Sequence, residues 1–213
     1  MRRTIQAAAR TIAQVIVAGS LAACAMASAA QQSSAEAVAT VDRLHAALVE
    51  IMKNAESLGF QGRLDYVEPV VLESFDFPFI TQFALGRYWS TLDDAQKTGM
   101  VDVFSRWTVA HYAARFDDYS GETFEVVSAA TERRARELVR TVLRRGGGSR
   151  EDVTLDYLLH EVDGAWRIIN VIANGVSDLS LKRADYGAVM SARGYDGLVE
   201  RLNNQIAEFA SGK

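Results

Sequence analysis

The stretch that most constrains the fold is GAWRIINVIANGVSDL, residues 164–179, which is as apolar as a buried strand but does not alternate cleanly. Successive side chains of a strand point to opposite faces, so a half-buried strand should alternate apolar and polar residues. Simple alternation divides its apolar residues into two sets: Trp166, Ile168 and Ile172 on one face, and Ile169, Val171 and Ala173 on the other. Both faces are then apolar, and each needs something other than water against it.

The residues on either side of the sheet region have helical spacing. Apolar residues recur at three- and four-residue steps from Val38 to Ala55, which predicts an amphipathic helix that ends at Gly59. Asp76-Phe77-Pro78 is a typical helix start, and Thr91-Leu92-Asp93-Asp94 resembles a capping box that opens a long helix to about Asp118. Two further helices are predicted to close the chain, over Leu179–Ala192 and Tyr195–Ala210.

The period changes from helical to two after Glu122. Four strands are predicted, over Phe124–Ala130, Arg136–Arg144, Val153–Val162 and Trp166–Ala173, and Asp163-Gly164 is a strong hairpin signal between the last two. Consecutive strands joined by short turns form an antiparallel meander. The sequence therefore predicts an α+β fold, in which N-terminal and C-terminal helices wrap a twisted four-stranded antiparallel sheet.

The second face of this sheet needs a cover, because an open antiparallel sheet normally leaves one face in water. The third strand adds Leu158 and Val162 to the apolar residues of that face. Either more helix lies against it, or it lines an apolar cavity. The spacing of the residues leaves both alternatives open.

The first thirty residues have the three parts of a secretory signal peptide. Arg2, Arg3 and Arg10 form a basic start, Ile12–Ala23 a short apolar run, and Ala27-Ser28-Ala29 a cleavage pattern of small residues. We therefore expect residues 1–30 to be removed and the mature protein to be exported. Leu21-Ala22-Ala23-Cys24 also has the form of a bacterial lipoprotein box, which leaves a lipid tether at Cys24 as an alternative.

Charge and cysteine content limit the partners of the mature chain. Removing residues 1–30 takes away three arginines and no acidic residue, so the formal net charge changes from −4 to −7. This acidity argues against nucleic-acid binding and against passive adhesion to anionic lipid. Cys24 is the only cysteine, so the processed chain has no disulfide and depends on its core for stability.

Catalytic and metal-binding patterns are weak. His45, His111 and His160 lie far apart on separate predicted elements, without ligand spacing, and no serine occupies a nucleophile elbow. We therefore expect no metal, no cofactor and no catalytic residue. The alternative is an exported enzyme with a cone-shaped cavity for a steroid-like or other apolar substrate. It would draw on Asp117, Asp118 and Tyr119 at the end of the long helix.

Several segments in order carry a family resemblance: FDFP, LGRYW, the helix with Gln96 and Phe104 that ends in Tyr112…Tyr119, and DGAWRI…V…GVS ahead of Arg183. Together they resemble the MlaC family, also called the toluene-tolerance family, whose members are periplasmic lipid-binding proteins. FALGRYW and FDDYSGETFEVV also resemble its hopanoid-associated HpnM branch. One departure is Leu181-Lys182-Arg183, where the family often has Asn-Tyr-Arg, so only Arg183 carries over.

The resemblance implies that residues 31–213 form a single lipid-binding domain. Such a domain would carry a phospholipid or a hopanoid in an apolar cavity between inner-membrane and outer-membrane complexes. The predicted lipid-binding residues are the apolar ones on the sheet and the helices facing it: Phe79, Phe83, Trp107, Phe116, Leu155, Tyr157, Ile172 and Val176. A third hypothesis is a structural scaffold whose core is completely filled by its own side chains.

Overall fold

The computed structural model describes residues 31–132, 135–146 and 151–212. The predicted signal peptide and Cys24 lie outside this range. Within it, no helix combines the length and the apolar character that crossing a membrane requires.

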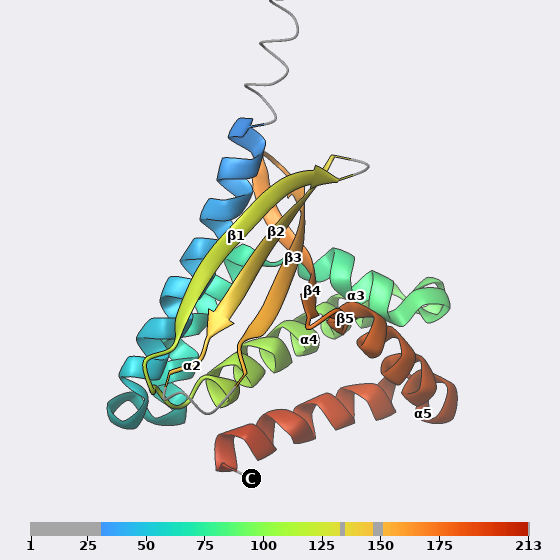
Figure 1. The fold of residues 1–213 in the computed structure, drawn as a ribbon. Coiled ribbons are helices and arrows are strands. Elements are labelled where there is room, and N and C mark those ends of the chain that lie inside the picture. The colour runs from blue at the N-terminus through green and yellow to red at the C-terminus, as the bar shows by residue number, and fades with distance from the viewer. Residues whose placement is uncertain (1–30, 133–134, 147–150, 213) are drawn as a thin grey trace, which may run out of the picture.

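Helices occupy both ends of the described chain, with the strands between them (Figure 1). The chain is helical over residues 31–53. The other helices, in order, are α2 (Ala55–Ser74), α3 (Phe77–Leu85), the 3-10 helix η1 (Gly86–Thr91), α4 (Asp94–Arg115) and α5 (Asp178–Ser211). The sequence-based helices are confirmed in order and approximate extent, although α4 ends at Arg115 rather than near Asp118.

The helix starts follow from their capping residues. The Asp76 side chain accepts a hydrogen bond from the backbone N–H of Phe79, with Pro78 in the first turn of α3. In α4 the capping box joins Asp93 and Gln96, not Thr91 and Asp94. The Thr91 hydroxyl instead donates to the carbonyl of Tyr88, which ends the 3-10 helix.

The sheet is an antiparallel meander in the order β1-β2-β3-β4-β5. Its strands are β1 (Thr123–Glu132), β2 (Arg136–Arg144), β3 (Val153–Val162), β4 (Ala165–Ala173) and a two-residue β5 (Val176–Ser177). The four predicted strands are confirmed, and β5 is an addition. Asp163 and Gly164 both have positive φ, 52° and 76°, as a tight hairpin turn between β3 and β4 requires.

A β-bulge in β4 changes the predicted faces of this strand. Leu159 pairs with Ile168 and Leu158 pairs with Asn170, so Ile169 is the extra residue. Beyond the bulge, Val171 pairs with the buried Tyr157. The simple alternation predicted from the sequence is therefore wrong after Ile168: Val171 and Ala173 join Trp166 and Ile168 on the inner face, and Ile172 lies on the outer face.

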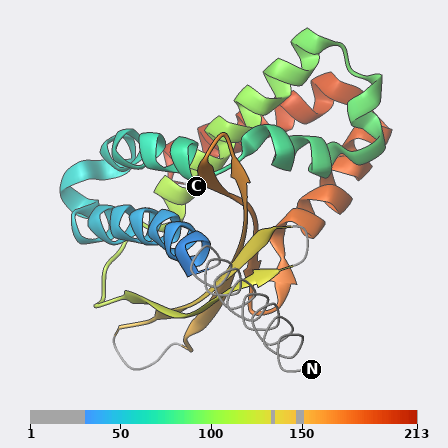
Figure 2. The ribbon, with the colours of Figure 1, turned by 90° about the horizontal axis from the view of Figure 1, so that it is seen from above.

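The N-terminal helix packs against the inner face of the sheet, on the side where all the helices lie (Figure 2). Its Thr40 donates to the carbonyl of Trp166, and the His45 ring lies 3.0 Å from the Tyr157 hydroxyl. The fully buried Glu137 carboxylate of β2 accepts hydrogen bonds from Ser33, Ser34 and Thr131. These contacts satisfy the polar groups that the helix and sheet bury between them.

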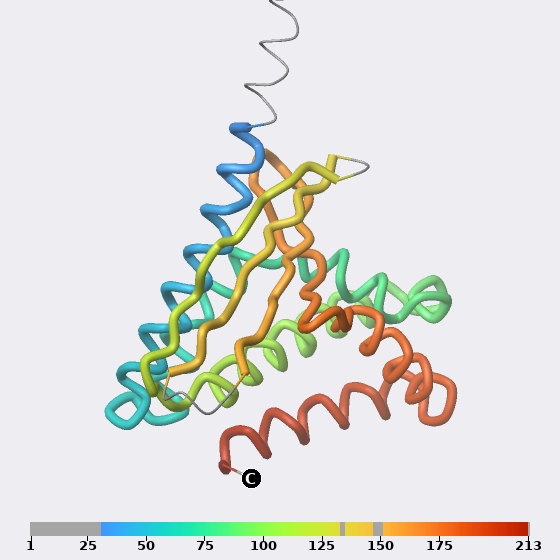
Figure 3. Tube along the Cα trace, in the orientation of Figure 1, coloured from blue at the N-terminus to red at the C-terminus, as the bar shows by residue number. Residues whose placement is uncertain are grey.

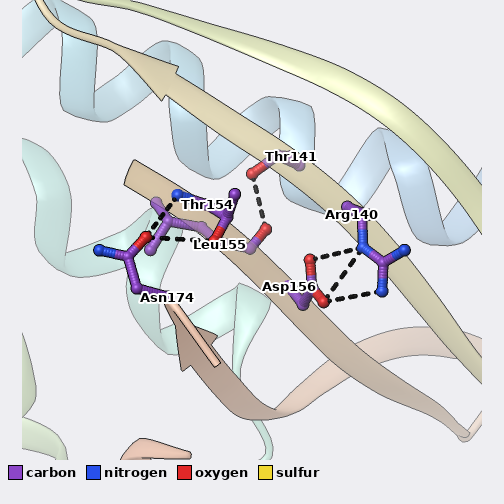
Figure 4. A network of polar contacts seen from close by, with 6 residues as sticks. All are labelled: Arg140, Thr141, Thr154, Leu155, Asp156 and Asn174. Carbon is purple, nitrogen blue, oxygen red and sulfur yellow. Dashed lines mark hydrogen bonds and ion pairs between the residues drawn. The ribbon is translucent and has the colours of Figure 1, made fainter. Parts of the chain in front are cut away.

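The outer face carries polar contacts between strands (Figure 4). Arg140 of β2 forms a bidentate ion pair with Asp156 of β3, at 3.1 Å. The Asn174 side chain accepts hydrogen bonds from the backbone N–H and hydroxyl of Thr154. Apolar residues such as Leu158 and Ile172 are only half-buried on this face. The cover that the sequence demands therefore lies on one face only.

The segment Phe75-Asp76, between α2 and α3, is hydrogen-bonded to the edge of the sheet at β4. Phe75 forms a parallel bridge with Ile168, and the Asp76 N–H donates to the Ile168 carbonyl at 3.1 Å. The Asp76 carboxylate also lies 2.7 Å from His160 of β3. One aspartate thus caps α3 and anchors its first turn at the edge of β4, where Phe79 also packs against His160.

Gly194 divides α5 into two helical halves, which lie at an angle to each other in Figure 3. Its φ of 66° and ψ of −165° belong to a region that only glycine adopts without strain. We expect Gly194→Ala to lower the free energy of unfolding by about 1–3 kcal/mol.

The matched control is Gly187→Ala in the same helix, where φ is not positive and a Cβ would meet nothing within 4 Å. There alanine should raise stability by about 0.5–1 kcal/mol, because glycine is the poorer helix former. Urea unfolding measures the change in unfolding free energy of each variant, which should be negative for Gly194→Ala and positive for Gly187→Ala. Equal effects at the two positions would contradict the role assigned to the break.

Candidate functional site: an apolar cavity with one polar end

A cavity of about 190 Å³ lies between α3, α4, the start of α5 and the inner face of β4. Most of its walls are aromatic or aliphatic. The apolar and aromatic lining residues are Phe75, Phe77, Ile80, Phe104, Trp107, Tyr112, Phe116, Ile169, Val171, Ala173 and Leu179. Such a space between a sheet and its helices suits a hydrocarbon ligand.

The bulge and the helix packing place these walls. Because Ile169 is the extra residue of the bulge, β4 turns Val171 and Ala173 toward the helices rather than toward solvent. On α4, Phe104 and Trp107 stack with their ring centroids 6.1 Å apart, and Tyr112 stacks at 5.9 Å on Phe116, the residue that follows the helix. These four rings form the side of the cavity that faces β4.

One end of the cavity is polar. Thr108, His111, Asn170, Asp178 and Lys182 complete the lining. The Lys182 Nζ lies 2.5 and 2.6 Å from the two Asp178 oxygens and 4.9 Å from the centre of the Trp107 ring. Asn170 accepts hydrogen bonds from Ser177 and from the backbone N–H of Leu179, so it joins β4 to the start of α5.

The second half of α5 covers part of this region. Its Phe209 ring lies 6.2 Å from Trp107 and 5.7 Å from His111, two residues of the cavity wall. Nearby, Arg106 of α4 contacts Asn203 at 3.4 Å. The half of α5 beyond Gly194 therefore packs into the core through the fully buried Leu198 and Leu202, and its last turns place Phe209 beside the cavity wall.

Two of the eight residues predicted to bind lipid, Trp107 and Phe116, line this cavity. Leu155 and Tyr157 lie on the same inner face of the sheet, paired with Ala173 and Val171, but do not line the cavity. Tyr157 is buried among core side chains and bonded to His45, and burial raises the pKa of its hydroxyl.

The other four predicted residues lie away from the cavity. Phe79 packs edge-on against His160, and Phe83 is 41% exposed beneath the Arg183 guanidinium. Ile172 is on the outer face, and Val176 is 51% exposed. These four residues were chosen because each is apolar and lies in a predicted helix or strand. The strand register and the orientation of α3 turn their side chains away from the cavity.

Most wall residues were missed, and one local signal could have found several of them. The consecutive pair Ile168-Ile169, followed by the polar Asn170, interrupts the apolar–polar alternation, and a bulge is one way for a strand to accommodate such an interruption. Reading it so would have moved Val171 and Ala173 to the inner face. No comparable signal indicated Phe75, Phe77 or Lys182, which reach the cavity only through the packing of helices.

Arg183 has a structural contact in α5. Its guanidinium donates to the carbonyl of Phe83 at 2.8 Å and stacks on the Phe83 ring. A Cβ on Gly86 would lie 3.0 Å from the same guanidinium, which together with a φ of 55° explains the glycine that ends α3. Arg183 therefore ties α5 to α3 and does not line the cavity.

The residues considered for catalysis lie elsewhere. Asp117 and Asp118 are exposed after α4 and line a second, more polar pocket with Arg115, Arg145 and Glu122, which shares only Phe116 with the apolar cavity. Tyr119 lies in a third pocket, beside the N-terminal helix. Within the described part of the chain, no group of histidine, cysteine or acidic side chains is arranged to hold a metal ion.

The comparisons with known proteins agree with this architecture. The family model described as MlaC protein matches residues 42–204. A solved structure of a phospholipid-binding protein from Ralstonia solanacearum, in complex with a phospholipid, superposes with a TM-score of 0.68 at 24% sequence identity. The match covers 84% of this chain and 98% of that one, and it supports the same fold. Because the family model spans most of the described residues, this chain belongs to the MlaC protein family.

Proposed function

We propose that this protein is a periplasmic lipid carrier that encloses the hydrocarbon of a phospholipid or hopanoid in the cavity described above. The observation that supports this most is the apolar space between α3, α4, α5 and β4, which the chain does not fill with its own side chains. The phospholipid bound by the Ralstonia relative adds support. In this proposal the mature domain is residues 31–213, released by cleavage of the leader, and it performs no chemical step.

The energetics favour a carrier over free diffusion of the lipid. Exposing hydrocarbon to water costs about 0.8 kcal/mol per CH₂, so a sixteen-carbon chain costs on the order of 13 kcal/mol. A cavity walled by phenylalanine, isoleucine and valine is about as apolar as the bilayer interior. Transfer between membrane and carrier is then nearly balanced. The direction of transport is set by the inner-membrane and outer-membrane complexes that load and unload the protein.

Loading requires the walls to separate. A volume of about 190 Å³ is below the roughly 300–1,000 Å³ of sites that enclose drug-sized ligands. Leu198 and Leu202, which follow Gly194, are fully buried in the core, whereas Phe209 in the last turns of α5 is only half-buried beside Trp107 and His111. We infer that lipid enters as these last turns of α5 shift away from Trp107 and His111.

The test is the lipid content of the purified protein. After export, purification without detergent and organic extraction, mass spectrometry should find close to one equivalent of lipid per chain. The identity of that lipid decides between phospholipid and hopanoid. Trace lipid in a protein whose circular dichroism shows the native fold would contradict a carrier and favour a filled scaffold.

A further inference from the structure

The face of α3 that points away from the cavity carries two aromatic rings with arginines stacked on them. Phe79 and Phe83, four residues apart on this face, lie with their ring centroids 6.4 Å apart. Arg136 of β2 stands 5.8 Å from the centre of the Phe79 ring, and Arg183 of α5 stands 4.8 Å from that of Phe83. Residues of three elements thus bring two cations and two rings together on one surface.

The 3-10 helix η1 continues this surface. Its Arg87 guanidinium stands 5.0 Å from the centre of the Tyr88 ring and donates a hydrogen bond to the Tyr88 hydroxyl at 3.0 Å. Gly86, the residue before Arg87, lies against the guanidinium of Arg183. Six residues therefore form what we call the aromatic–arginine strip: Phe79, Phe83, Arg87, Tyr88, Arg136 and Arg183.

The charge of the strip is not neutralised locally. Among the described residues, none of its three arginines forms an ion pair, whereas Arg140 on the outer face of the sheet is paired with a carboxylate. The Asp76 carboxylate near the strip is bonded to His160, and Glu132 lies across the β-ladder from Arg136 without pairing with it. The strip is therefore positively charged on a mature chain whose formal net charge is −7.

We propose that the aromatic–arginine strip docks this protein onto the surface of an anionic lipid bilayer. The guanidinium groups bind lipid phosphates, for which arginine has a matching geometry. The Phe83 ring, 41% exposed, enters the headgroup layer, where aromatic side chains beside basic ones are favoured. The net charge alone predicts repulsion from such a surface, so attachment depends on the concentration of arginines in the strip.

The shape of the strip favours a bilayer over an acidic protein. Anchor residues of a protein partner usually enter well-packed pockets. No residue of the strip lines the three pockets described above. A fluid layer of headgroups needs no such hollow, because it adapts to the surface that it meets.

Docking through the strip also orients the cavity. Arg183 directly follows Lys182, which lines the polar end of the cavity. The acidic charge carried by the rest of the protein is repelled by the same bilayer, so the strip side faces the membrane. This inference rests on the proposed carrier function, because docking brings the polar end of the cavity close to the membrane that supplies or receives the lipid.

The experiment is co-sedimentation of the mature protein with vesicles. One set of vesicles contains phosphatidylcholine alone, and the other contains equal parts of phosphatidylcholine and phosphatidylglycerol. We expect wild-type protein to bind the anionic vesicles at least about tenfold better than the neutral ones, because several arginines contribute only on the anionic surface. Raising the salt concentration should release the protein, because salt screens exposed charges.

Three variants and a control assign the binding to the strip. Arg87→Gln and Arg136→Gln should each lower the partition coefficient on anionic vesicles about fivefold, which corresponds to about 1 kcal/mol for one arginine at such a surface. Phe83→Ala should lower it without changing its salt dependence, because no charge is removed. Arg140→Gln removes the same charge from the outer face of the sheet and should leave the partition coefficient unchanged. Circular dichroism checks the fold of each variant.

Three results overturn the docking surface. The first is equal binding of folded wild-type protein to neutral and anionic vesicles. The second is a loss in Arg140→Gln as large as in Arg136→Gln, because net charge and not the strip would then control binding. The third is binding only to vesicles that also contain a membrane-protein complex, because a protein would then be the partner.

The lipid content of the same samples separates this inference from the carrier function. Protein that fails to bind anionic vesicles but still contains lipid after extraction contradicts only the docking surface. Folded protein that contains no lipid contradicts the carrier function itself.

Discussion

Ala173→Phe is expected to fold and to lose most of its bound lipid, whereas Ile172→Phe, one residue away, is expected to keep full loading. Ala173 lines the cavity, and the added ring occupies space that the lipid needs. Excluding even two methylene groups costs about 1.6 kcal/mol, which lowers affinity more than tenfold. Ile172 points to the outer face beside Asp156, where a larger side chain reaches only solvent and neighbouring strands.

The comparison is matched, because both changes add an aromatic ring to the same half-exposed stretch of β4. Lipid per chain is measured by extraction and mass spectrometry, with circular dichroism and thermal unfolding as controls for folding. A stability loss of about 1–3 kcal/mol at Ala173 is acceptable, since overpacking has that cost. Normal loading of Ala173→Phe, or loss of lipid in Ile172→Phe, would contradict the assigned faces of β4.

Acid is expected to destabilise the protein through His45. This side chain is 5% exposed, stacked on Phe124 at 4.0 Å and bonded to the Tyr157 hydroxyl. Burial lowers the pKa of His45 from 6.5 to about 3. The unfolded chain therefore binds a proton at this site that the folded chain does not bind. The stability contribution is complete above pH 6.5 and is lost as the pH falls toward 3.

At 1.36 kcal/mol per pH unit, lowering the pH from 6.5 to 4 removes about 3 kcal/mol of unfolding free energy through this one group. His45→Gln keeps a hydrogen-bonding group near Tyr157 and cannot titrate. We therefore expect the unfolding free energy, measured with urea, to fall less between pH 7 and pH 4 in the variant than in the wild type. The difference between the two proteins should be about 3 kcal/mol. An identical loss in both proteins would mean that His45 becomes protonated within the fold.

The helices and strands could be predicted because their signals are local. Asp76 with Pro78 marks a helix start, Asp163-Gly164 marks a hairpin, and Gly194 marks the break near which two C-terminal helices were expected. Each depends on the preferences of one or two residues. The family resemblance, carried by motifs in order, was confirmed by the family model.

The cavity wall could not be predicted to the same degree, because it depends on register and on contacts distant in sequence. One extra residue in β4 exchanged the faces of Val171 and Ile172. Phe83 and Val176 were predicted to bind lipid because they are apolar, but neither faces the cavity. The Phe83 ring lies under the Arg183 guanidinium, and Val176 belongs to an exposed two-residue strand. Lys182 was overlooked because a lysine in a helix is normally on the surface, and only the packing of α5 on α4 brings it to Trp107.

The central claim is that lipid hydrocarbon occupies the space between α4 and β4. It is tested most directly with a phospholipid that carries a photoreactive group at the end of an acyl chain. After loading, illumination and proteolysis, mass spectrometry should find the label on wall residues between 104 and 116, in α4 and just after it, and between 169 and 173 of β4. Label confined to the outer face of the sheet, around Leu158 and Ile172, would contradict the claim.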